Sequence, residues 1–270
     1  MTFALGPRAA KAGHRLIVHD RLDSTNSEAL RLARAGEAGP LWIVALEQTS
    51  GRGRRGREWV SATGNLAASL MFTAPVTPAV AANLGFVASL AVSAACRALA
   101  PDLLLSLKWP NDVLANDVWA SGGSAKGGKI AGLLLESEMQ GGALAIVVGF
   151  GVNLASAPEG MPFPAQSLQG AGQNVSAGAV FSALTDAWLD YASLWNEGRG
   201  FDVIRNAWLA QARGIGQAIS VRTGDRVESG IFETLDEEGR LVLRLDDGGT
   251  RLIAAGDVYF GNAADMGAAS

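Results

Sequence analysis

The chain has 270 residues, of which 49% are hydrophobic and 18% charged, which suits one large globular domain plus a small one. Its formal net charge of -4 argues against a protein built mainly to coat nucleic acid, which usually carries a basic domain. The single cysteine, Cys96, excludes an internal disulfide, and two histidines are too few for a cluster of soft metal ligands. We therefore expect a cytoplasmic protein in a reducing compartment.

Strands and helices are predicted to alternate in the first part of the chain. A helix should begin near Thr25 and end near Gly36, because Thr25 and Glu28 have the spacing of a capping box. A second helix should follow Pro78, where apolar residues recur at helical spacing and pack along a sheet. Short apolar runs predict strands at residues 16–18, 41–48, 65–72, 103–107 and 113–114.

The second predicted helix also has to be weighed as a membrane span, since no charged residue occurs between Trp59 and Cys96. Residues 79–96 are built mainly from small side chains, contain Asn83, and lack the Leu and Ile density of a bilayer segment. A buried helix is the better interpretation, and we expect no association with a membrane.

The second half of the chain predicts strands at residues 129–136 and 145–150, then helices at 176–196 and 201–212. Between them, residues 155–173 are rich in Pro, Gly and Ala, as in a mobile cover over a site or in a disordered insertion. From about residue 214, turn signals separate four short apolar runs, which indicate a small antiparallel barrel followed by a loose tail.

Residues Ser50–Arg57, here called the arginine loop, set four arginines among three glycines directly after a predicted strand. Glycines let the backbone approach a ligand closely, and each guanidinium offers a planar fork of donors for carboxylate or phosphate oxygens. The loop also matches the dinucleotide-binding pattern Gly-x-Gly-x-x-Gly, but a turn-rich stretch follows it and no acidic residue lies between Glu58 and Asp102. We predict an anion-binding loop, with a solvated surface loop as the plainer alternative.

Further polar motifs stand at predicted turns and strand ends. The turn at residues 108–112, Lys-Trp-Pro-Asn-Asp, contains one of the four lysines of the chain. Lys129 stands at the entrance of a strongly apolar strand, and Asn153 ends the next one, where its amide can donate and accept hydrogen bonds. Residues 24–26 precede a helix, where capping is the simplest role and is compatible with ligand contact.

In this order the motifs resemble those of the biotin protein ligases. The resemblance extends over roughly residues 16–260 and rests on Asp23-Ser-Thr-Asn26, Gln48 with the arginine loop through Trp59, residues 108–112, Lys129-Ile-Ala-Gly132 with Glu136, and Gly149-Phe-Gly-Val-Asn153. It implies an α+β fold, with a mixed-sheet catalytic domain of the biotin/lipoate ligase type at residues 1–213 and a small C-terminal SH3-like β-barrel at 214–270.

The resemblance also implies a reaction in two steps. Biotin and ATP give biotinyl-5′-AMP and pyrophosphate, and a lysine of a biotin carboxyl carrier domain then takes the biotinyl group. Such an enzyme must offset the repulsion between a carboxylate and an α-phosphate, which suits arginines and a lysine. By resemblance, Lys129 and Arg54 are the catalytic residues.

The binding residues follow from the same resemblance. Contacts to biotin are expected from Ser24, Thr25, Asn26, Gln48, Gly51, Arg52, Lys129 and Gly132. Contacts to ATP are expected from Arg54, Arg55, Arg57, Trp59, Lys108, Asn111, Asp112 and Asn153. Asp112 is also the candidate ligand for Mg²⁺.

Several alternatives stay open at the level of sequence. Residues 116–127 are longer than the tight hairpin expected before Lys129, so a shifted register would let Lys126 share its role. A lipoate or octanoate ligase has related chemistry, although the arginine loop and the 108–112 turn favour biotin. A biotin-responsive repressor is the alternative from another class, but 22 residues before Asp23 are fewer than the about 50 of an independent domain, so no DNA binding is expected. The acceptor carboxylase and a homodimer are left open.

Overall fold

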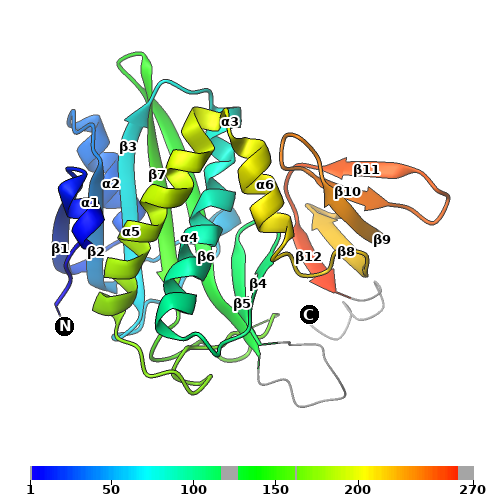
Figure 1. Ribbon diagram of the computed structural model, residues 1–270, viewed down its shortest axis with the longest axis horizontal. Helices are drawn as coiled ribbons and strands as arrows, with labels where there is room; N and C mark the ends of the chain where they lie inside the picture. The colour runs from blue at the N-terminus through cyan, green and yellow to red at the C-terminus, as the bar shows by residue number, and fades with distance from the viewer. Residues whose placement is uncertain (1, 117–126, 162, 261–270) are drawn as a thin grey trace.

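A computed structural model describes residues 2–116, 127–161 and 163–260 of the chain. A seven-stranded sheet carries most of the helices, and the C-terminal residues form a separate five-stranded antiparallel sheet (Figure 1). The predicted α+β class, with a mixed sheet followed by a smaller C-terminal sheet, is confirmed.

The large sheet has the strand order β1-β2-β3-β7-β6-β5-β4. Its first pair, β1 and β2, is parallel, and all the other neighbouring pairs are antiparallel, so the sheet is mixed. Every strand predicted in this part of the chain is present. The bounds are β1 Arg15–Leu22, β2 Leu41–Gln48, β3 Leu66–Ala74, β4 Leu105–Lys108, β5 Asp112–Ala115, β6 Gly128–Gln140 and β7 Ala143–Val152.

Helices cover both faces of the large sheet. Alternate residues of β2 show this division: Trp42 and Val44 belong to the core on the side of α4 and α5, while Leu41 and Ile43 pack with α2. A strand buried on both faces is a continuous apolar run rather than an alternating one, as β2 is. The helices are α1 Pro7–Lys11, α2 Thr25–Arg34, α3 Pro78–Ala82, α4 Leu84–Leu99, α5 Ala177–Trp195 and α6 Phe201–Leu209, with short 3-10 turns η1 Arg54–Gly56 and η2 Asn196–Gly198.

The sequence predicted a single helix after Pro78, but the structure has two, α3 and α4, which meet at Asn83. Pro78–Leu99 is long and apolar enough to cross a membrane, but 72% of its most apolar 18-residue stretch is buried inside the protein. Its main partners are α5 and the large sheet. This is the burial expected of a core helix, in line with the interpretation from sequence.

The start of α2 differs from the prediction. Ser24, not Thr25, is the N-cap residue, and its side chain makes no capping bond. The Thr25 hydroxyl lies 3.1 Å from Gln48 Oε1 at the end of β2, and Glu28 forms an ion pair with Arg31. The predicted capping box is therefore wrong, because Thr25 turns toward the sheet instead of toward its own helix.

Backbone hydrogen bonds hold the connection between β7 and α5 against the start of β6 and the end of β7. Lys129 N donates to Pro164 O at 2.8 Å, and Leu168 N donates to Asn153 O at 3.0 Å. The Leu168 side chain is fully buried. These contacts exclude a disordered insertion for the described part of residues 155–173, and they place this connection beside Lys129.

The C-terminal sheet has the order β11-β10-β9-β8-β12, and its last strand was not predicted from the sequence. The C-terminal sheet meets the 108–112 turn where Trp109 Nε1 donates to Gly239 O at 3.1 Å. The segment between α6 and this sheet covers the edge of β4, since Leu107 N donates to Gln211 O at 2.8 Å. The bounds are β8 Ala218–Thr223, β9 Arg226–Leu235, β10 Leu241–Arg244, β11 Thr250–Ile253 and β12 Asp257–Phe260.

Candidate active site

A cavity of about 650 Å³ lies between the large sheet, the arginine loop and the C-terminal sheet. Of the predicted site residues, Gly51 and Arg55 do not line it: Gly51 is buried against the backbone of Trp59, and Arg55 pairs with Asp257. The predicted residues that line the cavity are Ser24, Thr25, Asn26, Gln48, Arg52, Arg54, Arg57, Trp59, Lys108, Asn111, Asp112, Lys129, Gly132 and Asn153.

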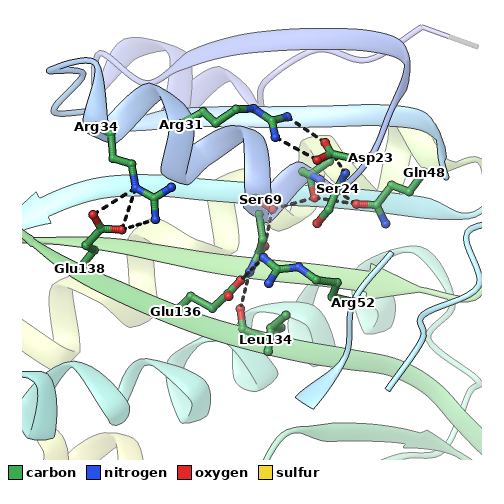
Figure 2. A network of polar contacts seen from close by, with 12 residues as sticks. Asp23, Ser24, Arg31, Arg34, Gln48, Arg52, Ser69, Leu134, Glu136 and Glu138 are labelled. Carbon is green, nitrogen blue, oxygen red and sulfur yellow. Dashed lines mark hydrogen bonds and ion pairs between the residues drawn. The ribbon is translucent and has the colours of Figure 1, made fainter. Parts of the chain in front are cut away.

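Neutral polar side chains, Ser24, Thr25, Asn26 and Gln48, line the cavity beside the start of α2. Figure 2 shows Ser24, Gln48 and Ser69 in the polar network of this region. Thr25 N donates to Gln48 Oε1 at 2.8 Å, and the Thr25 hydroxyl lies 3.1 Å from the same oxygen. Gln48 Nε2 donates to Ser61 Oγ at 2.7 Å. Because its oxygen faces donors and its nitrogen faces an acceptor, the Gln48 amide is held in one orientation.

Ser69 on β3 links these groups to Asn26. Its hydroxyl is fully buried and lies 2.7 Å from Thr25 Oγ1 and 2.6 Å from Asn26 Oδ1. Ser69 and Thr25 have one hydroxyl hydrogen each, but the network contains three oxygen–oxygen contacts: Thr25 to Gln48, Ser69 to Thr25 and Ser69 to Asn26. Removal of either hydroxyl therefore changes the hydrogen bonds of the whole network. Ser69 was not predicted as a site residue, although a serine inside an apolar strand signals a buried polar group that needs partners.

Glu136 on β6 extends this network toward the arginine loop. Its Oε2 accepts hydrogen bonds from Asn26 Nδ2 at 2.8 Å and from Arg52 Nη2 at 3.0 Å (Figure 2). Gly149 makes room for Asn26, since a Cβ at this glycine would lie 2.3 Å from Asn26 Oδ1. Glu136 belongs to a motif seen in the sequence but was given no role there, and it anchors the first arginine of the loop.

Trp59, just after the arginine loop, packs against glycines of β6 and β7. A Cβ at Gly132 would lie 2.9 Å from the indole and 3.0 Å from Lys129 Nζ, and a Cβ at Gly151 would lie 2.3 Å from the indole. Any side chain at either position would therefore displace the ring. Gly132 and Trp59, predicted to contact biotin and ATP respectively, thus meet at one point of the cavity.

The arginine loop folds back on itself and directs Arg54 inward. Gly53 N donates to Arg57 O at 2.7 Å. Arg54 Nη1 donates to Asn111 Oδ1 at 2.7 Å, and Nη2 donates to the carbonyl oxygen of Gly256 at 3.1 Å. Burial lowers the pKa of Arg54, although nearby carboxylates act in the opposite direction. A partly buried guanidinium bonded to neutral oxygens would be stabilised by a bound anion.

The next two arginines of the loop, Arg55 and Arg57, meet a single carboxylate. Asp257 Oδ2, at the start of β12, lies 3.0 Å from Arg55 Nη1 and forms a close ion pair with Arg57 Nη2. The side chain of Asp257 is 17% exposed. Asp257 was not predicted, because it stands 200 residues from Arg57 in the sequence and only the folded C-terminal sheet brings them together.

Lys129, at the start of β6, lines the cavity. Its Nζ lies 2.7 Å from Asp112 Oδ1 and 5.4 Å from the centroid of the Trp59 ring. The pairing of β5 with β6 shifts register between Val113 and Leu114, with Leu114 opposite Lys129. The other candidate, Lys126, lies outside the described residues, so its part in the site stays an open prediction.

Lys108 ends β4 beneath an aromatic cover. It is 6% exposed, and its Nζ lies 3.6 Å from the centroid of the Phe163 ring and 5.8 Å from that of Phe260. Burial lowers the pKa of Lys108 to about 8, although Asp112 opposes this effect. A nearby phosphate would raise this pKa again, because an opposite charge favours the ammonium form.

Asn153, at the end of β7, has an amide oxygen without a hydrogen-bond partner among the described residues. The residue is 2% exposed and lines the cavity, while its Nδ2 lies 3.3 Å from Lys129 O. A buried acceptor of this kind is costly unless it is paired. Its geometry suits an N–H or O–H donor of a bound ligand.

Comparisons with known proteins agree with this arrangement. Residues 18–153 match the Biotin/lipoate A/B protein ligase family, and residues 214–261 match the Biotin protein ligase C terminal domain. A biotin–(acetyl-CoA-carboxylase) ligase from Paracoccus denitrificans is 44% identical over 249 residues, which cover 89% of this chain and 98% of that protein. A bifunctional ligase/repressor from Bacillus subtilis is 28% identical, over 95% of this chain and 77% of its own length.

A solved structure shows the same fold. The biotin protein ligase from Aquifex aeolicus in complex with biotin and ATP matches with a TM-score of 0.73, over 92% of this chain and 99% of that one, at 24% sequence identity. The first family match spans about half of the chain, and the Paracoccus relative is covered almost completely. The chain therefore belongs to the biotin protein ligases.

Proposed function

We propose that this chain is an ATP-dependent biotin protein ligase, which forms biotinyl-5′-AMP and transfers biotin to a lysine of a biotin carboxyl carrier domain. The observation that carries the proposal is one cavity that Lys129 lines together with neutral polar side chains and arginines. The name of the Paracoccus relative supports a carboxylase as the source of the acceptor domain.

The neutral part of the cavity suits biotin. A ureido ring with an apolar tail needs a few aimed polar groups in an otherwise uncharged pocket. Thr25, Gln48 and Asn26 offer such groups, and the Trp59 ring offers an apolar wall. Lipoate and octanoate, the alternative substrates, lack ring N–H donors and would leave buried polar groups unpaired, which lowers affinity.

The cationic part of the cavity suits the first step, in which a biotin carboxylate oxygen attacks the α-phosphorus of ATP and pyrophosphate leaves. Lys129 Nζ lies 2.7 Å from the Asp112 carboxylate, and the two reacting anions would replace this carboxylate as its partners. Arg54, which donates to Asn111 beside Asp112, lines the same cavity and would add a second cation. Fixed cations stabilise the charge that develops during displacement, because they need no reorganisation when the reaction occurs.

In the second step the neutral amine of the carrier lysine attacks the acyl carbon, and AMP leaves. Until then the mixed anhydride has to be shielded from water. The arginine loop and the connection that contains Phe163 both border the cavity, so they are the segments that exclude water.

The residues present also fit Mg²⁺ that arrives with ATP. Magnesium at nucleotide sites is held by one or two carboxylates together with substrate phosphates and water. Asp112 supplies a carboxylate in the cavity, and the described residues contain no group of three or more metal-binding side chains that would form a separate cage. We propose that Asp112 would hold the ion, which would neutralise phosphate charge.

The remaining parts of the proposal concern location, assembly and domains. The buried free thiol of Cys96 supports a cytoplasmic location. We propose that the chain does not bind DNA, since the arginines of the loop have partners within the protein: Glu136, Asn111 and Asp257. A sequence-specific gel shift of duplex DNA would contradict this proposal. We keep residues 1–213 and 214–270 as the proposed domains, and a homodimer as a prediction for light scattering.

The test of the function mixes the purified chain with labelled biotin, ATP and a biotin carboxyl carrier domain. We expect pyrophosphate release and transfer of label to one carrier lysine, and no transfer to a carrier whose acceptor lysine is replaced by arginine. Parallel reactions with lipoate and octanoate should give no transfer. Transfer of lipoate with no transfer of biotin would overturn the proposal in favour of the alternative.

A further inference from the structure

Three arginines of the arginine loop contact two consecutive residues of the C-terminal sheet. Arg54 donates to the carbonyl oxygen of Gly256, while Arg55 and Arg57 both pair with the Asp257 carboxylate. The partners are about 200 residues apart in the sequence, so these contacts depend on how the two sheets are docked.

The C-terminal side of this contact is a rigid anchor. A Cβ at Gly256 would lie 2.5 Å from Val221 Cγ1, so the turn before β12 is packed tightly against β8. Asp257 is paired with Arg222 of β8 by backbone register, and its side chain is 17% exposed. The backbone that carries the carboxylate is therefore held in place by the sheet.

The loop side of the contact is closed by a hydrogen bond within the loop, from Gly53 N to Arg57 O, but its far end is open to solvent. A Cβ at Gly56 would meet no atom within 4 Å, and the Arg57 side chain is 59% exposed. At the other end of the loop, Arg52 is fixed to β6 through Glu136. The far end of the loop is therefore the part whose position depends most on Asp257.

We propose that Asp257 is a positioning residue, which holds the arginine loop closed over the cavity and so makes the C-terminal sheet responsible for retention of the acyl-adenylate. The proposal rests on the proposed ligase function. It assigns to Asp257 no contact with the reacting atoms, since its oxygen is occupied by the two arginines.

The test is the replacement Asp257→Asn, which keeps the shape of the side chain and removes its charge. Pre-formed labelled adenylate should leave the variant about three- to tenfold faster than it leaves the wild type, because two half-exposed ion pairs are lost. The release rate is measured after rapid removal of free biotin and ATP, and it is normalised to the adenylate formed. The matched control is Asp225→Asn, the same change at an exposed turn of the same sheet, which should leave release unchanged.

Two further variants separate positioning from a general loss of structure. Arg57→Gln should speed release on its own and add little in combination with Asp257→Asn, because both changes remove the same pair. Asp257→Glu should restore part of the retention. If Asp257→Asn lowers the melting temperature strongly, the Arg55→Gln, Arg57→Gln double variant removes the same ion pairs from the loop and leaves the C-terminal sheet intact.

The results that overturn the proposal are distinct from those that overturn the ligase function. If the wild type forms adenylate and folded Asp257→Asn releases it at the wild-type rate, the positioning role is wrong while the function stands. Tighter ATP binding by Asp257→Asn with unchanged release would show that the carboxylate competes with phosphates, which also contradicts positioning. If the wild type forms no adenylate from biotin and ATP, the proposed function itself fails.

Discussion

The two parts of the cavity hold their side chains by different means. In the neutral part, Thr25, Asn26 and Ser69 are 4%, 3% and 0% exposed and are hydrogen-bonded to one another. In the cationic part, Arg52 and Arg57 have side chains that are 41% and 59% exposed and pair with carboxylates. A buried, satisfied network is rigid, whereas exposed ion pairs contribute roughly 0 to 1 kcal/mol and rearrange easily. Under the proposed function, recognition of the uncharged ring would belong to the fixed, buried part of the cavity, and the handling of charge to the more exposed part.

The largest effect is expected at Lys129. Lys129→Ala removes the cation that we propose to contact the two reacting anions, so adenylate formation should fall about 10² to 10³-fold. Pyrophosphate release in single turnovers measures the effect, and an unchanged melting temperature shows that the fold survives. Lys126→Ala is the control: near-normal release by Lys129→Ala together with a loss in Lys126→Ala would mean that the register assigned to this strand is wrong.

A smaller effect is expected at Arg54, the partly buried arginine of the loop that donates to Asn111. Arg54→Gly removes one charge-assisted contact, and retention of the adenylate should fall about tenfold or more. The variant should still make adenylate and should label exposed lysines on bystander proteins. Biotin incorporation into an unrelated lysine-rich protein, compared at equal adenylate production, measures the leak. Equal bystander labelling by wild type and variant would mean that Arg54 does not retain the intermediate.

Ser69 tests the fixed part of the cavity. Ser69→Ala removes the hydroxyl shared by Thr25 and Asn26, so biotin affinity should fall about five- to tenfold while the release rate of bound adenylate changes less. Calorimetric titration with biotin measures the affinity. Ser89→Ala is the matched control. Ser89 is also fully buried, but its hydroxyl bonds Phe86 and Trp208, which do not line the cavity. An equal loss of affinity in both variants would show a general effect on stability.

Local signals in the sequence predicted the elements of the fold, and the resemblance to the biotin protein ligases predicted most of the residues that line the cavity. Continuous apolar runs mark the strands that are buried on both faces, such as β2, and the arginine loop is a contiguous pattern of charge and glycine. The predicted site residues, which are spread between positions 24 and 153, line one cavity because most of them stand near the ends of neighbouring strands.

The remaining features depend on contacts between distant segments. Asp257 acquires a partner only when the C-terminal sheet docks beside the 108–112 turn, and nothing in its local sequence marks it. Thr25 was predicted as part of a capping box, but Gln48 and Ser69 compete successfully for its hydroxyl. Tertiary hydrogen bonds of this kind override a local capping preference.

The smallest effect concerns Lys108, a buried cation that belongs to neither part. Burial lowers the pKa of Lys108 from 10.5 to about 8 in the folded protein, so its charge should be lost between pH 7 and pH 9. If the ammonium contacts the nucleotide, the KM for ATP in the first step should rise about threefold over this range. Lys108→Met should give a high KM at both pH values, and Lys108→Arg, which keeps its charge, should give no rise.

The same residue makes a prediction about stability, with a definite sign. The folded pKa lies below the unfolded value of 10.5, so burial of the charged amine destabilises the protein fully below pH 8. This cost is relieved as the pH rises from about 8 toward 10.5, because the folded state then binds fewer protons than the unfolded state. Lys108→Met should therefore stabilise the protein most at pH 7 and progressively less toward pH 10. A difference in melting temperature that stays constant between pH 7 and pH 10 would show that Lys108 is not a buried, titrating cation.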